Sequence, residues 1–281
     1  MHRSLSVLAS AAVAVSAAAC GLPMGRLNAE ARDTWTHSYP FGKSGEVSIA
    51  NVNGRIDVEA SEGSTVEVRA ERVARAATEQ MAKQLLPNIP INDRSTPDRV
   101  SVETGRVNGI LIGASYTVDY HVTAPKAAAV RATTVNGRIL IRGFAGRITA
   151  QATNGLIETK DVTGGLEARN VNGGVRAEFS SLGAGDVNLA TVNGGVRIVL
   201  PEKAKATVNA TWVNGGFSSP GLTFDVRESG RRHFEGQLNG GGTSITATTV
   251  NGGIRVATAA AAGADAGADV DVPKTRDRVA P

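Results

Sequence analysis

The sequence predicts an all-β protein built as a parallel β-solenoid, similar to a β-helix or β-roll, with short coils. Three observations support this. The chain has 33 glycines among 281 residues but only 4% aromatic residues, which suits a thin repetitive architecture better than a thick globular core. Val, Ile and Thr, which favour strands, dominate its middle. Glycine and the dipeptide Asn-Gly recur there at regular intervals.

Residues 1–19 are typical of a secretory signal peptide, because a short positive start precedes an apolar stretch that is too short to span a bilayer. The stretch ends in three alanines and Cys20, which resembles a bacterial lipobox, although lipoproteins prefer Leu where Ala17 stands. Cys20 is the only cysteine of the chain, and a free thiol would be a liability in an oxidising compartment. We therefore expect Cys20 to become a diacylated N-terminus that anchors the protein in a membrane. Plain secretion after cleavage behind Ala19 is the alternative.

A tether is expected over 20–45, followed by an N-terminal β region over 46–129. Within this region, apolar residues recur at the spacing of an amphipathic helix, which predicts a helical insert near 74–86. The residues with this spacing are Ala74, Ala77, Met81 and Leu85. Glu79 and Lys83 lie one turn apart on the insert and can pair.

The repeat solenoid is expected over 130–256. Its glycines follow a nine-residue period that resumes after a three-residue insertion, at Gly137, Gly146, Gly155, Gly164, Gly173, Gly185 and Gly194. An apolar residue stands two positions after each of them. Every second glycine usually follows an asparagine, at intervals of 18, 18, 21 and 21 residues, in Asn136-Gly137, Asn154-Gly155, Asn172-Gly173, Asn193-Gly194 and Asn214-Gly215. One coil therefore has ~18–21 residues, with two short strands and two turns.

An antiparallel meander is the rival architecture, because Asn-Gly is also the strongest hairpin signal. Recurrence of the same inward residue favours stacked coils, since each coil buries its apolar row only against its neighbours. Like residues of successive coils would then lie ~4.8 Å apart, with Ile139, Ile157 and Val175 in one interior column. A second column is expected at Val135, Thr153, Val171, Val192 and Val213.

The asparagine column allows two interpretations. Inward amides would bond along the axis as a ladder, whereas outward asparagines would simply supply positive φ at turns. On the outer face, Glu158 and Arg176 fall at matching positions of adjacent coils and could pair, a contact worth under ~1 kcal/mol. The segment 257–281 lacks large apolar residues, which predicts a disordered tail.

The arrangement resembles a bacterial family of β-strand-repeat proteins known as "putative adhesins", a family of unknown function, over roughly residues 45–256. The resemblance rests on Val52-Asn53-Gly54, the helical insert, the strand from Tyr116 to Pro125, and the Thr-Val-Asn-Gly-Gly repeats at Thr191–Gly195 and Thr249–Gly253. It implies an exported or membrane-anchored β-solenoid, and it provides no catalytic residues.

No catalytic residue, metal site or cofactor is expected. Nonapeptide rolls bind Ca²⁺ through aspartates, whereas Arg176 and Arg197 stand in the repeats here. The histidines are scattered and form no zinc-like pattern. Carboxylates such as Asp57 and Glu59 show nothing that distinguishes an acid from a base. The formal charge of +4 is spread without a basic run, which argues against nucleic-acid binding.

Trp212 is the candidate contact residue for a ligand or partner. It stands where the other repeats carry Thr or Asn, and it would point outward if Val213 points inward. An exposed tryptophan could stack on a sugar or a protein partner. Alternatively the excursion over 218–235 covers it, since this long segment needs a surface to pack on.

The leading hypothesis is an exported lipoprotein of the cell envelope whose solenoid presents a repeated surface to a protein or polysaccharide of the envelope. In a Gram-negative cell it would lie at the outer membrane or the periplasmic face. A carbohydrate-active β-helix enzyme is one alternative, and it requires a groove lined by two close carboxylates. A spacer that assembles end to end through open coil edges is the other.

Overall fold

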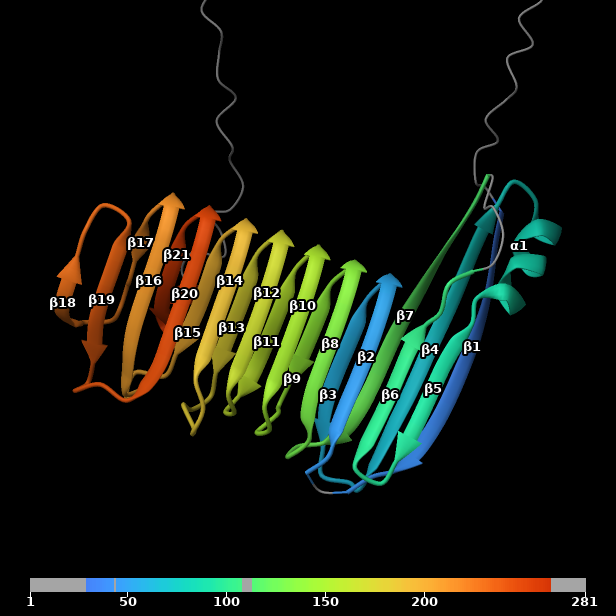
Figure 1. Ribbon diagram of the computed structural model, residues 1–281, viewed down its shortest axis with the longest axis horizontal. Helices are drawn as coiled ribbons and strands as arrows, with labels where there is room; N and C mark the ends of the chain where they lie inside the picture. The colour runs from blue at the N-terminus through green and yellow to red at the C-terminus, as the bar shows by residue number, and fades with distance from the viewer. Residues whose placement is uncertain (1–28, 43, 108–112, 264–281) are drawn as a thin grey trace, which may run out of the picture.

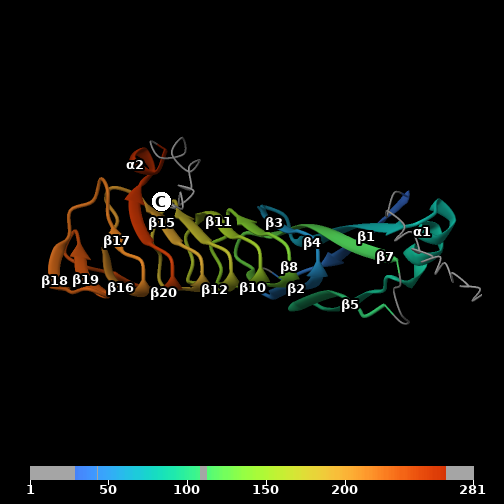
Figure 2. The same ribbon diagram turned by 90° about the horizontal axis from the view of Figure 1, so that it is seen from above.

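The computed structural model describes residues 29–42, 44–107 and 113–263 and shows two long, mostly parallel sheets that lie face to face (Figures 1 and 2). Among these residues, sheet A has ten strands, in the spatial order β1 (Ala29–Pro40), β4 (Thr65–Ala76), β7 (Ala114–Pro125), β3 (Ile56–Ser61), β9 (Ile139–Arg142), β11 (Ile157–Val162), β13 (Val175–Phe179), β15 (Val196–Leu200), β21 (Ile254–Thr258) and β17 (Phe217–Ser218). Sheet B has eleven, in the order β18 (Asp225–Ser229), β19 (His233–Leu238), β16 (Ala206–Asn214), β20 (Thr243–Asn251), β14 (Val187–Asn193), β12 (Leu166–Asn172), β10 (Ile148–Asn154), β8 (Ala129–Asn136), β2 (Glu46–Asn53), β6 (Arg99–Thr104) and β5 (Ile91–Thr96).

The repeat region forms stacked coils, each with one strand in sheet B and one in sheet A. Neighbouring coils pair in parallel, and Ile157 stands in register with both Ile139 and Val175. All three side chains are buried. The predicted interior column is therefore confirmed, and the stacked, solenoid-like arrangement holds for the repeats in place of the antiparallel meander.

The coils do not stack in the order of the sequence at the C-terminal end. Strand β20 of the last coil lies between β14 and β16, so that Asn251 pairs with both Asn193 and Asn214. The expectation that Val213 follows Val192 directly in its column is therefore wrong. The antiparallel hairpin of β18 and β19 then extends sheet B beyond β16 (Figure 1).

The valines before the asparagines face outward. Val135, Val171, Val192 and Val213 are exposed by 41%, 42%, 40% and 44%. The residue before each of them is the one that faces the interior, and the buried examples include Thr134, Asn170 and Thr191. The Asn-Gly corner turns the chain from one sheet to the other, so the alternation of one strand does not continue in phase into the next.

The N-terminal end of the fold is antiparallel. Strand β4 pairs with β1 on one side and β7 on the other, and β5 pairs with β6. Part of the segment predicted as a tether is thus a 12-residue strand, because β1 runs over Ala29–Pro40 and buries Ala31 and Tyr39.

The helical insert is shorter than predicted. Helix α1 covers Glu79–Leu85 and continues into a short 3-10 helix, η1 (Leu86–Asn88). The residues before it complete β4, where pairing with two strands overrides their helical spacing. Thr78 caps α1 by accepting from the amide of Met81, and Lys83 pairs with Glu79 at 2.6 Å as predicted.

The described chain ends in a short helix, α2 (Ala259–Gly263), which packs against β21 and β15. Residues 257–263 of the predicted tail therefore have regular structure, and the rest of it lies outside the described residues. The predicted signal peptide and Cys20 lie outside them as well. Within the described ranges, no helix is long and apolar enough to cross a membrane.

Candidate functional site

Asparagines line the corner at which each coil passes from sheet B to sheet A. Their side chains face the solvent, and yet each amide donates to the next carbonyl oxygen at 2.8 or 2.9 Å. The ladder runs through Asn53, Asn136, Asn154, Asn172, Asn193, Asn251 and Asn214. The asparagines therefore point outward and still form the hydrogen-bonded ladder that was expected of inward side chains. The expectation that they supply positive φ is wrong, because positive φ lies at the glycine after most of them, as at Gly155 and Gly173.

The glycine after each asparagine is required by the stacking. At Gly173, φ is +135°, and a Cβ would lie 1.7 Å from the carbonyl oxygen of Gly155. Gly155 has the same relation to Gly137, at 1.9 Å. The backbones of adjacent coils touch at this corner, so the Asn-Gly repeat is explained by the architecture and is no ligand site by itself.

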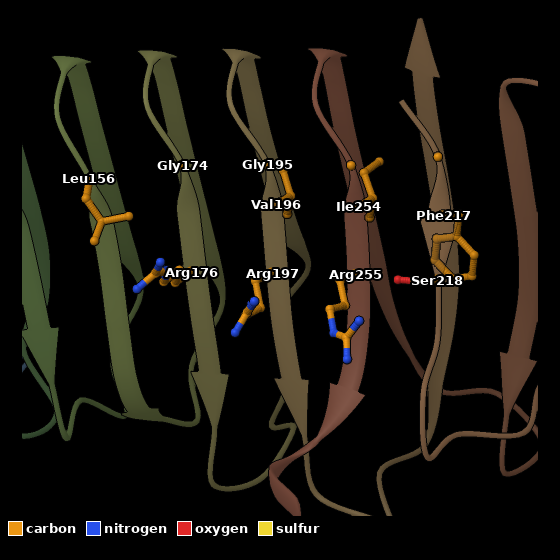
Figure 3. Close-up of a pocket in the computed structure, with 12 residues that line it drawn as sticks. Leu156, Gly174, Arg176, Gly195, Val196, Arg197, Phe217, Ser218, Ile254 and Arg255 are labelled. Carbon is orange, nitrogen blue, oxygen red and sulfur yellow. The ribbon is translucent and has the colours of Figure 1, made fainter. Parts of the chain in front are cut away.

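A groove on the outer face of sheet A is the best candidate for a functional site (Figure 3). It has a volume of about 650 Å³. Its charged residues are Arg176, Arg197 and Arg255, which stand in register on the adjacent strands β13, β15 and β21. We call these three residues the arginine column. Leu156 lies at one end of the groove, and Phe217 and Ser218 lie at the other.

The groove exists because four successive coils have glycine at one corner position. Gly174, Gly195, Gly253 and Gly216 line it, and we call them the glycine floor. The same position carries larger side chains in the preceding coils, namely Arg55, Arg138 and Leu156.

The backbone leaves room for a side chain at two of the four floor glycines, whereas a Cβ on Gly174 or Gly195 would lie 3.3 or 3.2 Å from a carbonyl oxygen of the next coil. A Cβ on Gly253 would have its nearest contact at 3.7 Å, and one on Gly216 would meet nothing within 4 Å. This contrasts with the glycines of the ladder corner.

Glu158 lies beside the arginine column, on the strand next to Arg176. It matches Arg176 in register, as predicted. Its ion pairs among the described residues are nevertheless with Arg138 and, at 3.0 Å, with Lys160, so the expected Glu158–Arg176 pair is wrong. Burial opposes ionisation of Glu158, but these two cations outweigh it and lower the pKa of its carboxyl below the usual value.

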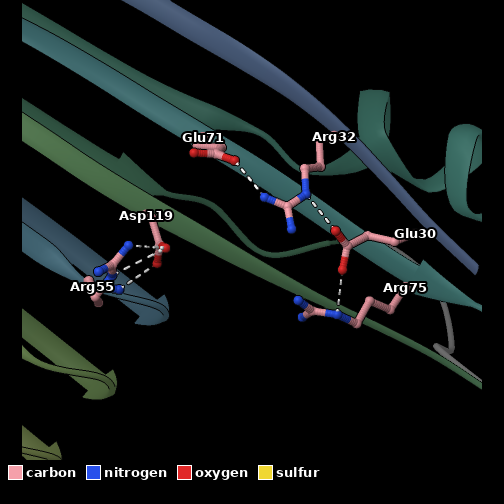
Figure 4. Close-up of polar contacts among 6 residues, drawn as sticks. All are labelled: Glu30, Arg32, Arg55, Glu71, Arg75 and Asp119. Carbon is pink, nitrogen blue, oxygen red and sulfur yellow. Dashed lines mark hydrogen bonds and ion pairs between the residues drawn. The ribbon is translucent and has the colours of Figure 1, made fainter. Parts of the chain in front are cut away.

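Charged residues at the N-terminal end of sheet A are paired with one another (Figure 4). On β1, Glu30 accepts from Arg32 and from Arg75 of β4, and Arg32 also donates to Glu71 at 3.0 Å. The hydrogen bond from Arg32 is the main reason why the pKa of Glu30 is lowered. The charges of this network are paired with one another, and Glu30 and Arg32 lie on the edge strand β1, where charges hinder pairing with another edge.

Trp212 lies in the interior, and its side chain is only 7% exposed. Its ring stacks on Phe217 at a centroid distance of 6.4 Å, and Phe217 stacks on Phe234 at 4.0 Å. Phe224 meets Phe234 edge to face. The excursion therefore covers Trp212, which is not an exposed contact residue, and the aromatic cluster closes the C-terminal end of the core.

The predicted site residues thus fall into two groups. The asparagines and glycines of the repeats lie together at the ladder corner, whereas Trp212 is part of the core. Arg176 and Arg197 were considered from the sequence as an argument against calcium, and Arg176 also as a partner of Glu158, but the groove was missed. The signal was present in the second glycine of each Asn-Gly-Gly repeat, since Asn-Gly alone suffices for the corner.

The described residues contain no group of three or more His, Cys, Asp or Glu side chains that could hold a metal ion. The Oδ2 atom of Asp57 lies 3.7 Å from the Nδ1 atom of His121. Glu59 stands beside Arg142 on the next strand.

Stacked coils, an outer groove and repeated side-chain columns define a solenoid-like β-repeat protein. The chain belongs to the Toastrack DUF4097 family, whose model matches residues 99–257. No curated protein shows significant similarity to it.

Three solved structures are similar to the chain at low identity. A "putative cell adhesion protein" from Clostridium sporogenes has 10% identity and a TM-score of 0.43, and the match covers 81% of this chain and 100% of that one. A "putative adhesin" from Bacteroides fragilis has 11% identity and a TM-score of 0.32, with 80% and 97% covered. Another from Parabacteroides distasonis has 10% identity and a TM-score of 0.24, with 80% and 97% covered.

Proposed function

We propose that this chain is an adhesin-like, non-enzymatic binding protein of the cell envelope, held at a membrane by a lipid on Cys20. The observation that carries the proposal is the groove on sheet A, where the arginine column and the glycine floor lie on an open lateral face. A face of this kind can hold an extended partner along the axis of the solenoid. Membership in the Toastrack family agrees with an adhesin-like role.

The chemistry of the carboxylates favours binding over glycoside cleavage. A glycosidase needs a general acid whose pKa is raised, together with a second carboxylate nearby. Glu158 is the one acidic residue among the described residues that is buried, at 8% exposure, and its two cationic partners lower its pKa instead. Its environment is therefore the opposite of what an acid catalyst requires.

The ends of the solenoid favour a binding protein over a spacer that assembles end to end. At one end, β1 carries the charged network of Glu30 and Arg32. At the other, sheet A ends in the two-residue strand β17, and sheet B ends in the fully exposed, mostly polar β18. Short and charged edges are features that prevent strand pairing between molecules.

The anchor is tested by expressing the full chain and a Cys20→Ser variant in bacteria supplied with labelled palmitate. The full chain is expected to carry label and to sediment with membranes, whereas the variant is expected to do neither. A full chain without label would refute the lipid anchor.

Binding is tested with the Cys20→Ser protein on beads and purified envelope fragments from a bacterium that carries the protein. Retention is expected to fall when Gly253→Leu fills the groove and to persist in Arg131→Gln, a change on the outer face of sheet B. Equal retention by all three proteins would remove the support for sheet A as the binding face.

A further inference from the structure

We infer that the groove on sheet A is a binding site for a linear acidic polysaccharide, with the arginine column contacting its carboxylates. The inference rests on the proposed function and adds the chemical class of the ligand. Three features carry it, namely the register of the arginines, the open glycine floor and the aromatic residue at the end of the groove.

The arginine column determines the charge and shape of the ligand. Adjacent strands lie ~4.8 Å apart, so the outer two arginines of the column are separated by ~10 Å along the solenoid axis. Guanidinium groups bind carboxylates through two parallel hydrogen bonds. A row of three therefore suits a chain that presents carboxylates repeatedly along its length.

The glycine floor shows that the space above it is not a by-product of the fold. Leu156 occupies the equivalent corner position one coil before Gly174, and Arg138 occupies it one coil earlier. A side chain at this position is therefore compatible with stacking. The groove is open in the three coils that carry the arginine column and in the coil of Phe217.

The ends of the groove favour a saccharide. Phe217 is half-buried, lines the groove and is held by the rings of Trp212 and Phe234. Phe234 covers one face of this ring, so only its uncovered part is available to lie against the apolar face of a sugar. Beside it, Ser218 continues the column and offers a hydroxyl. At the opposite end, Glu158 takes the next position in register after Arg176, so the row of arginines ends there.

Nucleic acid fits this site less well. Tight nucleic-acid binding commonly uses about six to ten phosphate contacts from clustered basic residues, whereas the column provides three. The neighbouring outward position on these strands holds Glu178, Val199 and Ala257 and adds no positive charge.

The test uses the full mature chain with Cys20→Ser and measures binding of a hexameric galacturonate by titration calorimetry. The methyl ester of the same oligomer, which has no charge, is the matched ligand control. We expect binding of the acid and at least tenfold weaker binding of the ester. Arg197→Gln and Gly253→Leu are each expected to weaken binding of the acid at least tenfold. Arg131→Gln removes the same charge from sheet B and should change it less than twofold.

Several results would overturn the inference. Equal binding of acid and ester would exclude a role for the carboxylates. An equal loss in Arg131→Gln would show attraction by net charge alone. Single-stranded DNA and vesicles of phosphatidylglycerol are tested as competitors of the hexamer. If either displaces it at a concentration of negative charge below that of the hexamer itself, the groove belongs to another polyanion. Circular dichroism of each variant excludes unfolding as the cause.

Failure of the inference can be told apart from failure of the proposed function. If the protein retains envelope fragments through sheet A but does not bind galacturonate, the ligand class is wrong and the binding role stands. If neither is bound, both are wrong.

Discussion

Replacing Gly173 with alanine tests the corner at which adjacent coils touch. Its φ of +135° is a conformation that residues with a side chain rarely adopt, and this strain costs ~1–3 kcal/mol. The new Cβ would also lie 1.7 Å from the carbonyl oxygen of Gly155, so the two coils must move apart. Overpacking of this kind costs a further ~1–3 kcal/mol. The expected loss of about 2–6 kcal/mol is a large share of the ~5–15 kcal/mol that stabilises a typical protein.

The adjacent glycine provides a matched control. A Cβ on Gly174 would have its nearest contact at 3.3 Å, with the carbonyl oxygen of Gly195. We expect Gly174→Ala to cost less than ~1 kcal/mol, in the range of ordinary surface substitutions. Urea unfolding followed by far-ultraviolet circular dichroism compares both variants in the Cys20→Ser background. Similar midpoints for the two variants would refute the role of backbone contact at the first glycine.

Three further changes test other parts of the structure. Glu158→Gln should destabilise the protein at neutral pH by about 1 kcal/mol, because its carboxylate is paired. The pKa of Glu158 is lower in the folded chain than its value of about 4.3 when unfolded. The stability difference between the parent protein and the variant should therefore disappear as pH falls through the folded pKa. A stability difference that persists in acid would contradict the ion pairs. Trp212→Ala should cost ~3–5 kcal/mol in urea unfolding if the ring closes the core, whereas a loss below 1 kcal/mol would indicate an exposed ring. Asn172→Ala removes two ladder hydrogen bonds and should cost ~1–2 kcal/mol in urea unfolding. Asn188→Ala, at an exposed position of the same sheet, should cost under ~0.5 kcal/mol. Equal losses in the two variants would show that the ladder does not stabilise the fold.

The sequence was sufficient to predict the coils, but it did not show which residues before the Asn-Gly corner face the interior. Counting back by two from an inward residue such as Val175 places Val171 in the interior, as it would in a straight strand. The Asn-Gly corner lies between these residues and re-aims the chain, so that Asn170 is inward and Val171 is exposed. An inward position also suited the apolar side chain of Val171. The same reasoning placed Val213 inward and therefore predicted that its neighbour Trp212 would point outward.

The order of the coils could not be predicted either. The repeats around Asn193, Asn214 and Asn251 are too similar to specify which of them pair. The long excursion after Asn214 carries the aromatic residues that close the core, so its coil lies at the end. The last coil then fills the remaining position beside β14. This order brings Arg255 next to Arg197, and the groove therefore depends on pairing that only the structure reveals.

Cross-linking at the inserted coil is the most direct test, because the arginine column requires β20 and β21 to lie inside the stack. Thr246 pairs with Asn188 on one side and with Asn209 on the other. In the Cys20→Ser background, cysteine pairs at 188 and 246 and at 209 and 246 should form disulfides, since paired strands bring their Cα atoms within the ~4.4–6.8 Å that the bond needs. Cysteines at 188 and 209 lie two strands apart, ~10 Å, and should stay reduced. A disulfide between 188 and 209, with none to 246, would show that the coils stack in sequence order, and the arginine column as described here would not exist.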